Sequence, residues 1–147
     1  MTSAGDPTMA RRIATAEICR DATNTVVDRV VSEATRAANL LGFGGDAASH
    51  YGDGIRETLP FAFGLMELPD GSEREAGITR LASMVRGVTE QNHIPQIVER
   101  GLVAIAFRVA RETVRHNAAA KGFTADELEH EFMEFADQLE GLLFKTP

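Results

Sequence analysis

The chain has 147 residues, a formal net charge of −7 and 44% hydrophobic residues, values typical of one globular domain with its own core. The negative charge argues against a surface that neutralises the phosphates of nucleic acids, so we expect no direct contact with nucleic acid. The single cysteine, Cys19, excludes an internal disulfide bond and a zinc site built from several thiolates.

We also expect no membrane segment, because the sequence has no apolar run of the roughly 20 residues that a spanning helix needs. The first residues, MTSAGDPTMARR, lack the apolar stretch of a secretory signal, so we expect a cytoplasmic protein. Residues 1–7 are small and polar and are predicted to form a flexible N-terminus, followed by a single helical domain over residues 8–144.

Apolar residues recur at helical spacing along the chain, and no segment alternates for long with the period of a strand. The sequence therefore predicts an all-α protein of about five helices, either globin-like or a helical bundle. The helices are expected over residues 8–41, 47–68, 72–91, 95–121 and 124–142.

Breaks are predicted within and after the first two of these segments. The first segment forms one helix, or two that break near Asn24, and it is ended by three glycines, Gly42, Gly44 and Gly45. Pro60 lies inside the second segment and predicts a kink or a helix that restarts there.

Two capping boxes mark the starts of later helices. In this motif a Ser or Thr and a Glu three residues later bond to each other's backbone amides. Ser72 with Glu75 fits the pattern, and so does Thr124 with Glu127.

A corner between helices is predicted at the sequence NHIP, residues 92–95. The residue before a proline avoids the α region, so the preceding helix must end by Ile94. Proline is favoured in the first turn of a helix, and the next helix is therefore expected to begin at Pro95.

The helix that follows this corner is apolar over more than half of its circumference. One face carries Val98, Leu102, Ile105 and Val109, and another carries Val103, Phe107, Ala110 and Val114. Such a helix is either central in the fold, or one of its faces lines a ligand cavity or a dimer interface. In the second case, we assign the cavity or dimer role to the face that contains Phe107.

A narrow polar stripe on the same helix consists of four arginines, Arg100, Arg108, Arg111 and Arg115. The last predicted helix carries seven acidic residues, so the stripe is expected to be a solvated face that pairs with them. The alternative is a site for a small anion, with Arg108 and Arg111 as contacts.

Two Glu-x-x-His pairs, Glu90 with His93 and Glu127 with His130, match a ligand pattern of helical di-metal proteins. The helix between them has about 25 residues and a length of roughly 37 Å, so antiparallel packing would place the pairs at opposite ends of the molecule. We therefore expect no metal site, and we expect His130 to face water.

Haem binding is an alternative, because His93 or His116 would serve as a ligand if either pointed into an apolar pocket.

Cys19 lies in an apolar helix stripe and is predicted to be a small buried side chain. No serine, cysteine or lysine stands near a histidine and a carboxylate in a recognisable nucleophile arrangement. We therefore expect no catalytic residue, no enzyme activity and no cofactor.

Residues 78–116, ITRLASMVRGVTEQNHIPQIVERGLVAIAFRVARETVRH, carry a family resemblance. They resemble the N-terminal domain of RsbR-type stressosome co-antagonists and the equivalent region of PucR-like transcriptional regulators. Ile94-Pro95 is similar to the helix corner of that pattern, and Phe107-Arg108 to its aromatic–arginine pair. The preceding HYGDGIRETLPFAFGLMEL, residues 50–68, is similar to the segment that leads into the same helix pair.

The resemblance implies a globin-like helical fold without haem that forms a homodimer and feeds a signal to a partner domain. We therefore predict a non-enzymatic sensory and dimerisation domain in signal transduction and transcription regulation. It would respond to a small-molecule effector or a regulatory protein partner. The alternatives are a haem- or metal-binding helical protein, with or without enzyme activity, and a plain structural adaptor.

Overall fold

The computed structural model describes residues 6–42 and 45–144, which form six α-helices and a short 3-10 helix and no strand. The helices are α1 (Pro7–Asp21), α2 (Thr23–Leu41), α3 (Gly45–Met66), α4 (Ser72–Gln91), α5 (Gln96–Asn117), the 3-10 helix η2 (Ala119–Lys121) and α6 (Ala125–Leu143). The predicted all-α class is confirmed. Residues 1–5 of the predicted flexible N-terminus, and Gly44 of the predicted helix stop, lie outside the described residues.

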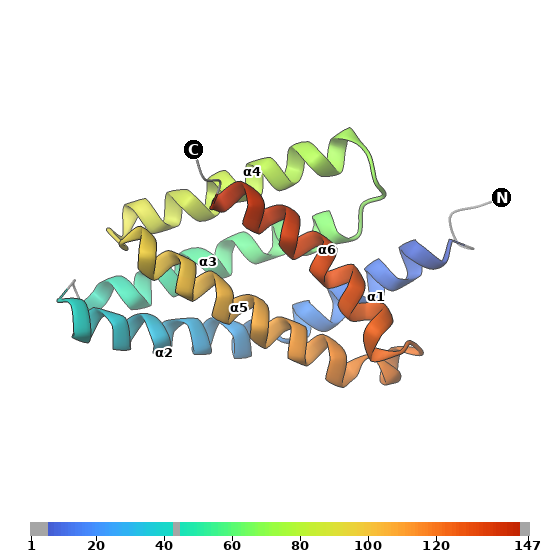
Figure 1. Ribbon diagram of the computed structural model, residues 1–147, viewed down its shortest axis with the longest axis horizontal. Coiled ribbons are helices and arrows are strands. Elements are labelled where there is room, and N and C mark those ends of the chain that lie inside the picture. The colour runs from blue at the N-terminus through green and yellow to red at the C-terminus, as the bar shows by residue number, and fades with distance from the viewer. Residues whose placement is uncertain (1–5, 43–44, 145–147) are drawn as a thin grey trace.

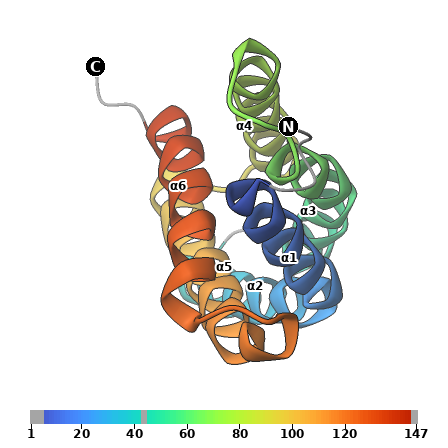
Figure 2. The ribbon, with the colours of Figure 1, turned by 90° about the vertical axis from the view of Figure 1, so that its right-hand side faces the viewer.

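Helices α2 to α6 run back and forth along the long axis of the molecule, and consecutive helices point in opposite directions (Figure 1). Helix α5 packs on α1, α2 and α6, while α4 packs on α3 and α6. Seen along the long axis, α1 lies between α3 and α6 and packs on both (Figure 2). Buried side chains from all six α-helices form one hydrophobic cluster, which is the core of the fold.

Helix α1 begins earlier than the sequence predicts. The side chain of Asp6 caps it by accepting a hydrogen bond from the backbone amide of Thr8 at 2.9 Å, and Pro7 is the first helical residue. Proline fits that position because its missing amide would have no partner there. Residues 6 and 7 are thus a capped helix start and not part of the flexible N-terminus predicted over residues 1–7. The first predicted segment divides into α1 and α2 at Ala22, close to the break expected near Asn24.

Helix α3 continues through Pro60 as one element, so the helix restart predicted there does not occur. Pro60 is exposed, and water can therefore solvate the carbonyl that loses its helical hydrogen bond. Close packing of α3 on α2 depends on Gly52, because a Cβ atom at this position would lie 2.2 Å from Cγ2 of Val31.

One of the two predicted capping boxes forms. The hydroxyl of Thr124 accepts a hydrogen bond from the amide of Glu127 at 3.1 Å, and the Glu127 carboxylate accepts one from the Thr124 amide at 2.9 Å. The box predicted at Ser72 is wrong, because Ser72 is already the first residue of α4 and Gly71 is the N-cap. The Ser72 hydroxyl therefore sits one position too late to cap the helix.

The corner between α4 and α5 is a Schellman motif, in which two backbone hydrogen bonds close the end of a helix. The amide of His93 donates to the carbonyl of Glu90, and the amide of Ile94 donates to the carbonyl of Thr89, both at 3.1 Å. His93 has a φ of 55°, a left-handed conformation that residues other than glycine rarely adopt. Helix α4 ends before Ile94 as predicted, but Pro95 is the N-cap of α5 and not part of its first turn.

A buried ion-pair cluster fixes α1 against the rest of the molecule. The guanidinium of Arg12 donates to the carbonyl of Leu68 at 2.9 Å and to the carboxylate of Asp70 at 2.7 Å, and it holds the pKa of Asp70 below its ordinary value. Glu131 of α6 lies 3.5 Å from Nε of Arg12 and accepts a hydrogen bond from Arg11 at 3.0 Å. Both Arg12 and Glu131 are buried, so this cluster ties α1 to the α3–α4 turn and to α6.

Candidate functional site

The face of α5 that contains Phe107 points into the core of the chain. Val103, Ala110 and Val114 are 7%, 9% and 0% exposed, and Phe107 is half-buried. Three of the four side chains are therefore covered by the chain's own helices, and Phe107 is the one that remains partly accessible. On the opposite face of α5, Val98 and Leu102 are buried, while Ile105 and Val109 are half-buried.

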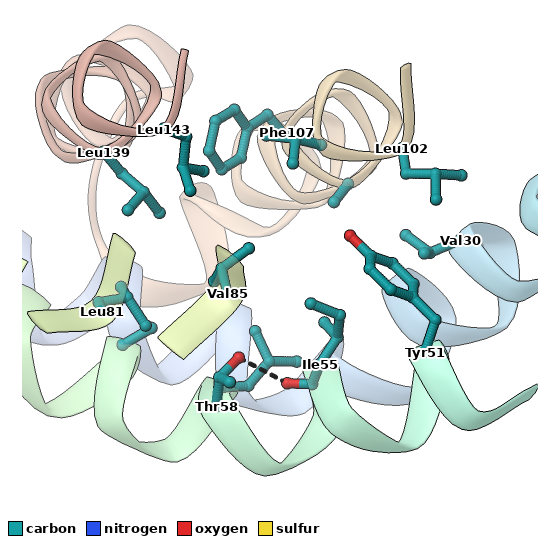
Figure 3. A pocket seen from close by; sticks show the side chains of 14 residues that line it. Val30, Tyr51, Ile55, Thr58, Leu81, Val85, Leu102, Phe107, Leu139 and Leu143 are labelled. Atoms are coloured by element: carbon teal, nitrogen blue, oxygen red, sulfur yellow. Dashed lines mark hydrogen bonds between the residues drawn. The ribbon is translucent and has the colours of Figure 1, made fainter. Parts of the chain in front are cut away.

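Two cavities lie along the Phe107 face. The first, which we call the Tyr51 cavity, has a volume of about 80 Å³ and is lined from α2, α3, α4, α5 and α6. Tyr51 and Ile55 of α3 lie on one side of it, and Leu102 and Phe107 of α5 lie on the other (Figure 3). Val103 also belongs to its wall, so two residues of the predicted face line this cavity.

The second cavity, which we call the Cys19 cavity, has a volume of about 90 Å³ and is lined from α1, α2, α3, α5 and α6. Phe107 and Ala110 contribute to it from α5, and Cys19 contributes from α1. Phe107 packs edge-on against Phe132 of α6, with ring centroids 6.2 Å apart and ring planes at 81°. Val114 is the residue of the predicted face that lines neither cavity.

The two cavities share a wall, which we call the Phe107 partition. Its five residues line both cavities: Leu59, Ala62, Ala106, Phe107 and Leu139. Helices α3 and α5 make few close contacts with each other, and each presents an alanine to this wall, Ala62 from α3 and Ala106 from α5. The space remains open because a side chain of one carbon cannot fill the gap between two helices.

The walls of both cavities are apolar. The hydroxyl of Thr58 is occupied, because it donates to the carbonyl of Ile55 at 2.8 Å. Burial raises the pKa of Tyr51 to about 12 and that of Cys19 to about 12, so both groups stay neutral near pH 7. A buried water needs about two to four polar partners, which these walls do not offer.

Empty space of this size lowers the stability of the folded state. In cores truncated by mutation, the loss of stability increases by about 24 cal/mol per Å³ of residual cavity. Protein interiors have few voids larger than a water molecule, so two adjacent cavities along one helix are unusual. A bound apolar molecule would restore the missing contacts.

A buried polar cluster adjoins the Tyr51 cavity where α3, α4 and α5 meet. Glu99 of α5 is 2% exposed, and its Oε2 accepts a hydrogen bond from the hydroxyl of Thr89 of α4 at 2.6 Å. Tyr51 is close to both groups: besides burial, the negative charge of Glu99 raises the Tyr51 pKa, while a hydrogen bond with Thr89 lowers it. The first turn of α5 is therefore linked to the end of α4 beside the cavity.

The predicted pairing of the arginine stripe with the last helix is confirmed for two of its members. Arg115 donates to Asp126 at 2.8 Å and to Glu129 at 2.6 Å, and these bonds raise the pKa of its guanidinium. Arg111 lies 3.5 Å from the same Glu129. Arg108 is exposed and has no ion pair among the described residues. The two predicted anion contacts thus differ, because the charge of Arg111 is compensated by α6.

Glu90, His93, Glu127 and His130, which match the Glu-x-x-His pattern of di-metal proteins, do not gather at one place. His130 is exposed, as predicted, and lies 3.3 Å from Glu134, while the carboxylate of Glu127 is held by its capping box. Within residues 6–42 and 45–144, no three His, Cys, Asp or Glu side chains are arranged to hold a metal ion. His93 and His116, the alternative haem ligands, are both exposed and line neither cavity.

Of the predicted face of α5, Val103, Phe107 and Ala110 line a cavity, whereas the wall on the α3 side was not predicted. Leu59 and Ala62 gave no signal, because leucine and alanine are common at any core position of a helix. Tyr51 is the only tyrosine of the chain, but a single aromatic residue at helical spacing does not distinguish a cavity wall from ordinary core. Cys19 was correctly predicted to be buried, without any indication that it borders a cavity.

No family model matches the chain, and no curated protein or solved structure is significantly similar to it. In the described part of the chain, no helix has both the length and the apolar character needed to cross a bilayer. The geometry of α5 and its two cavities is therefore the main guide to function.

Proposed function

We propose that the chain is a non-enzymatic, cytoplasmic sensory domain of signal transduction and transcription regulation, which forms a homodimer and relays a signal to a regulatory partner or output domain. The observation that carries this proposal is the position of α5, which lines both cavities and packs on α1, α2 and α6. A molecule that filled the cavities would shift α5 against these three neighbours. The resemblance of residues 78–116 to RsbR-type and PucR-like sensory domains supports the same function.

A displacement of α5 would be passed to neighbouring helices through contacts near its two ends. Near its start, Glu99 of α5 accepts the hydrogen bond from Thr89 of α4. Near its other end, Arg115 binds two acidic residues of α6. Packed helices move between discrete arrangements and do not deform continuously, so a small displacement of α5 would change these contacts as a unit.

We propose that the dimer contact lies where α2 ends and α5 begins, because three of the four side chains of the Phe107 face are buried. Leu40, Leu41 and Ile97 are 77%, 61% and 80% exposed, which makes them the most exposed large apolar side chains among the described residues. The two segments lie at the same end of the long axis (Figure 1). Ile97 belongs to the first turn of α5, so the geometry of a dimer formed there would follow a displacement of this helix.

Size-exclusion chromatography with in-line light scattering tests this function, with the absorption spectrum recorded across the same peak. We expect a colourless dimer, which Ile97→Asp converts to a folded monomer because a charge replaces an exposed apolar contact. Ile13→Asp on α1 is the matched control and should leave the dimer intact. A monomeric wild-type protein would contradict the proposal, and a peak with haem absorption would favour the haem-binding alternative.

A further inference from the structure

The two cavities point to a class of ligand, an inference that rests on the proposed sensory function. We infer that the signal molecule is a small, uncharged apolar compound, with about the bulk of one hydrocarbon ring or a short chain. It binds in the joined space of the Tyr51 and Cys19 cavities after Phe107 moves out of the partition.

The chemistry of the walls defines the polarity of this ligand. The hydroxyl of Thr58 is already hydrogen-bonded, and Tyr51 and Cys19 are neutral at physiological pH. A charged or strongly hydrogen-bonding compound would lose its hydration and find no partner. An apolar compound loses little in leaving water and gains close contacts with the walls.

The volumes define the size of the ligand. An engineered apolar cavity of roughly 150 Å³ binds benzene, and neither cavity reaches that volume alone, at about 80 and 90 Å³. Joined, the two cavities slightly exceed it. Both are far below the roughly 300–1,000 Å³ of pockets for drug-sized ligands, so a larger effector does not fit.

The Phe107 partition contains a side chain that is able to move. Phe107 is half-buried, so a change of its χ1 rotamer can turn the ring toward solvent instead of into packed core. Leu59 and Ala106 of the same wall are also half-buried, whereas Ala62 and Leu139 are buried. The partition thus reaches the surface on one side, and its opening both joins the cavities and provides a path from solvent.

Benzene is the probe for this site, and Cys19 is the reporter. Cys19 is the only cysteine of the chain and borders one cavity. Its thiol is neutral while it is buried, so a small uncharged disulfide reagent reacts with it only after an opening exposes it to water, and the rate measures that opening. With the wild-type chain, we expect benzene to raise the melting temperature by several degrees and to slow the Cys19 reaction about ten-fold, because a ligand stabilises the state that binds it.

Two variants with matched controls locate the site. Ala106→Leu fills the space beside the partition and should abolish the benzene-induced rise in melting temperature and the slower Cys19 reaction. Ala104→Leu adds the same atoms at an exposed position of α5 and should leave both effects of benzene unchanged. Phe107→Leu opens the partition and should increase the affinity for benzene. Phe123→Leu removes the same atoms from a half-buried phenylalanine outside both cavities and should not.

The inference is overturned if benzene has neither effect on the wild-type chain, or if it still binds to folded Ala106→Leu. Binding to Phe107→Leu without binding to the wild type would also overturn it, because the partition would then be closed in the native chain. If Ala106→Leu does not fold, the comparison of Phe107→Leu with Phe123→Leu decides. The Ile97→Asp experiment tests the dimer separately, so failure of the ligand and failure of the proposed function are distinguishable.

Discussion

At the scale of single residues, His93 illustrates the energetic cost of a helix end. His93 takes the left-handed position of a Schellman motif, and Gly122 takes the same position after η2, with φ values of 55° and 86°. The left-handed conformation is about 1 kcal/mol less favourable for a residue with a side chain, whereas glycine adopts it without this penalty. We therefore expect His93→Gly to raise the free energy of unfolding by about 0.5–1 kcal/mol, measured by urea denaturation.

Gly122→Ala is the reciprocal control for this prediction. It should lower the free energy of unfolding by about 1 kcal/mol, because it introduces the strain that His93→Gly removes. A loss of stability in His93→Gly would show that the imidazole makes a stabilising contact that outweighs the backbone strain.

Glu127 gives a prediction about pH. Hydrogen bonds with the amide and the hydroxyl of Thr124 lower the pKa of Glu127 below its ordinary value of 4.5. A carboxyl group with a lowered pKa in the folded state stabilises the fold above the unfolded-state pKa, and this stabilisation is lost as the pH falls through the folded-state pKa.

Glu127→Gln keeps a side chain that can cap the helix but removes the titration. We expect the variant to lose less stability than the wild type when the pH is lowered below 4.5, as measured by urea denaturation across that range. Glu112→Gln, at an exposed position of α5, is the control and should follow the wild type. If the free energy of unfolding changed with pH in the same way in wild type and Glu127→Gln, the titration of Glu127 would not contribute to the loss of stability in acid.

At the scale of helices, the cluster of Arg12 and Glu131 determines how α1 is held. Arg12→Met leaves Glu131 buried with only Arg11 as partner, and it removes the bonds to the α3–α4 turn. Breaking a buried ion pair costs about 3–5 kcal/mol, so we expect a loss of about 3 kcal/mol in chemical denaturation. Arg36→Met removes an exposed ion pair with Glu33 and should change stability by less than about 0.5 kcal/mol. Equal effects of the two substitutions would contradict the role of the cluster.

Helix positions were predictable where the signal is local. The Thr124 capping box and the corner before Pro95 each depend on a few neighbouring residues, and both were located from the sequence. The prediction failed at Ser72 by one position, because Gly71 serves as the cap. At Pro60, one of the two predicted outcomes, a helix restart, does not occur, because an exposed helix face tolerates a proline. These outcomes depend on how the segment meets its neighbours, which a local pattern does not contain.

At the scale of the whole molecule, the all-α class followed from periodicity, but the cavities did not. A cavity is a relation between helices: it arises because Ala62 of α3 and Ala106 of α5 happen to share one wall. Periodicity marked the Phe107 face of α5 as apolar and left open whether a partner, a ligand or the core covers it. In the structure, neighbouring helices cover Val103, Ala110 and Val114 of this face, and Phe107 is half-buried.

At the Phe107 partition, we expect a substitution that raises the free energy of unfolding to abolish ligand binding. Ala62→Leu places three carbons in empty space and should raise the free energy of unfolding by about 1 kcal/mol, while it abolishes benzene binding. Ala48→Leu, at a buried position of α3 outside both cavities, should instead lower stability by about 1–3 kcal/mol through overpacking. Thermal and urea unfolding of both variants check this. A loss of stability in Ala62→Leu would contradict the presence of unfilled space beside this wall.

Methyl NMR spectra of the full chain, before and after saturation with benzene, test the central claim most directly. We expect the methyl resonances of Val103 and Leu139, which line the cavities, to shift, together with that of Ile97 at the exposed start of α5. Shifts at all three sites would mean that filling the core moves α5 and reaches the surface. Shifts confined to the cavity walls, with Ile97 unchanged, would contradict a sensory role for this helix.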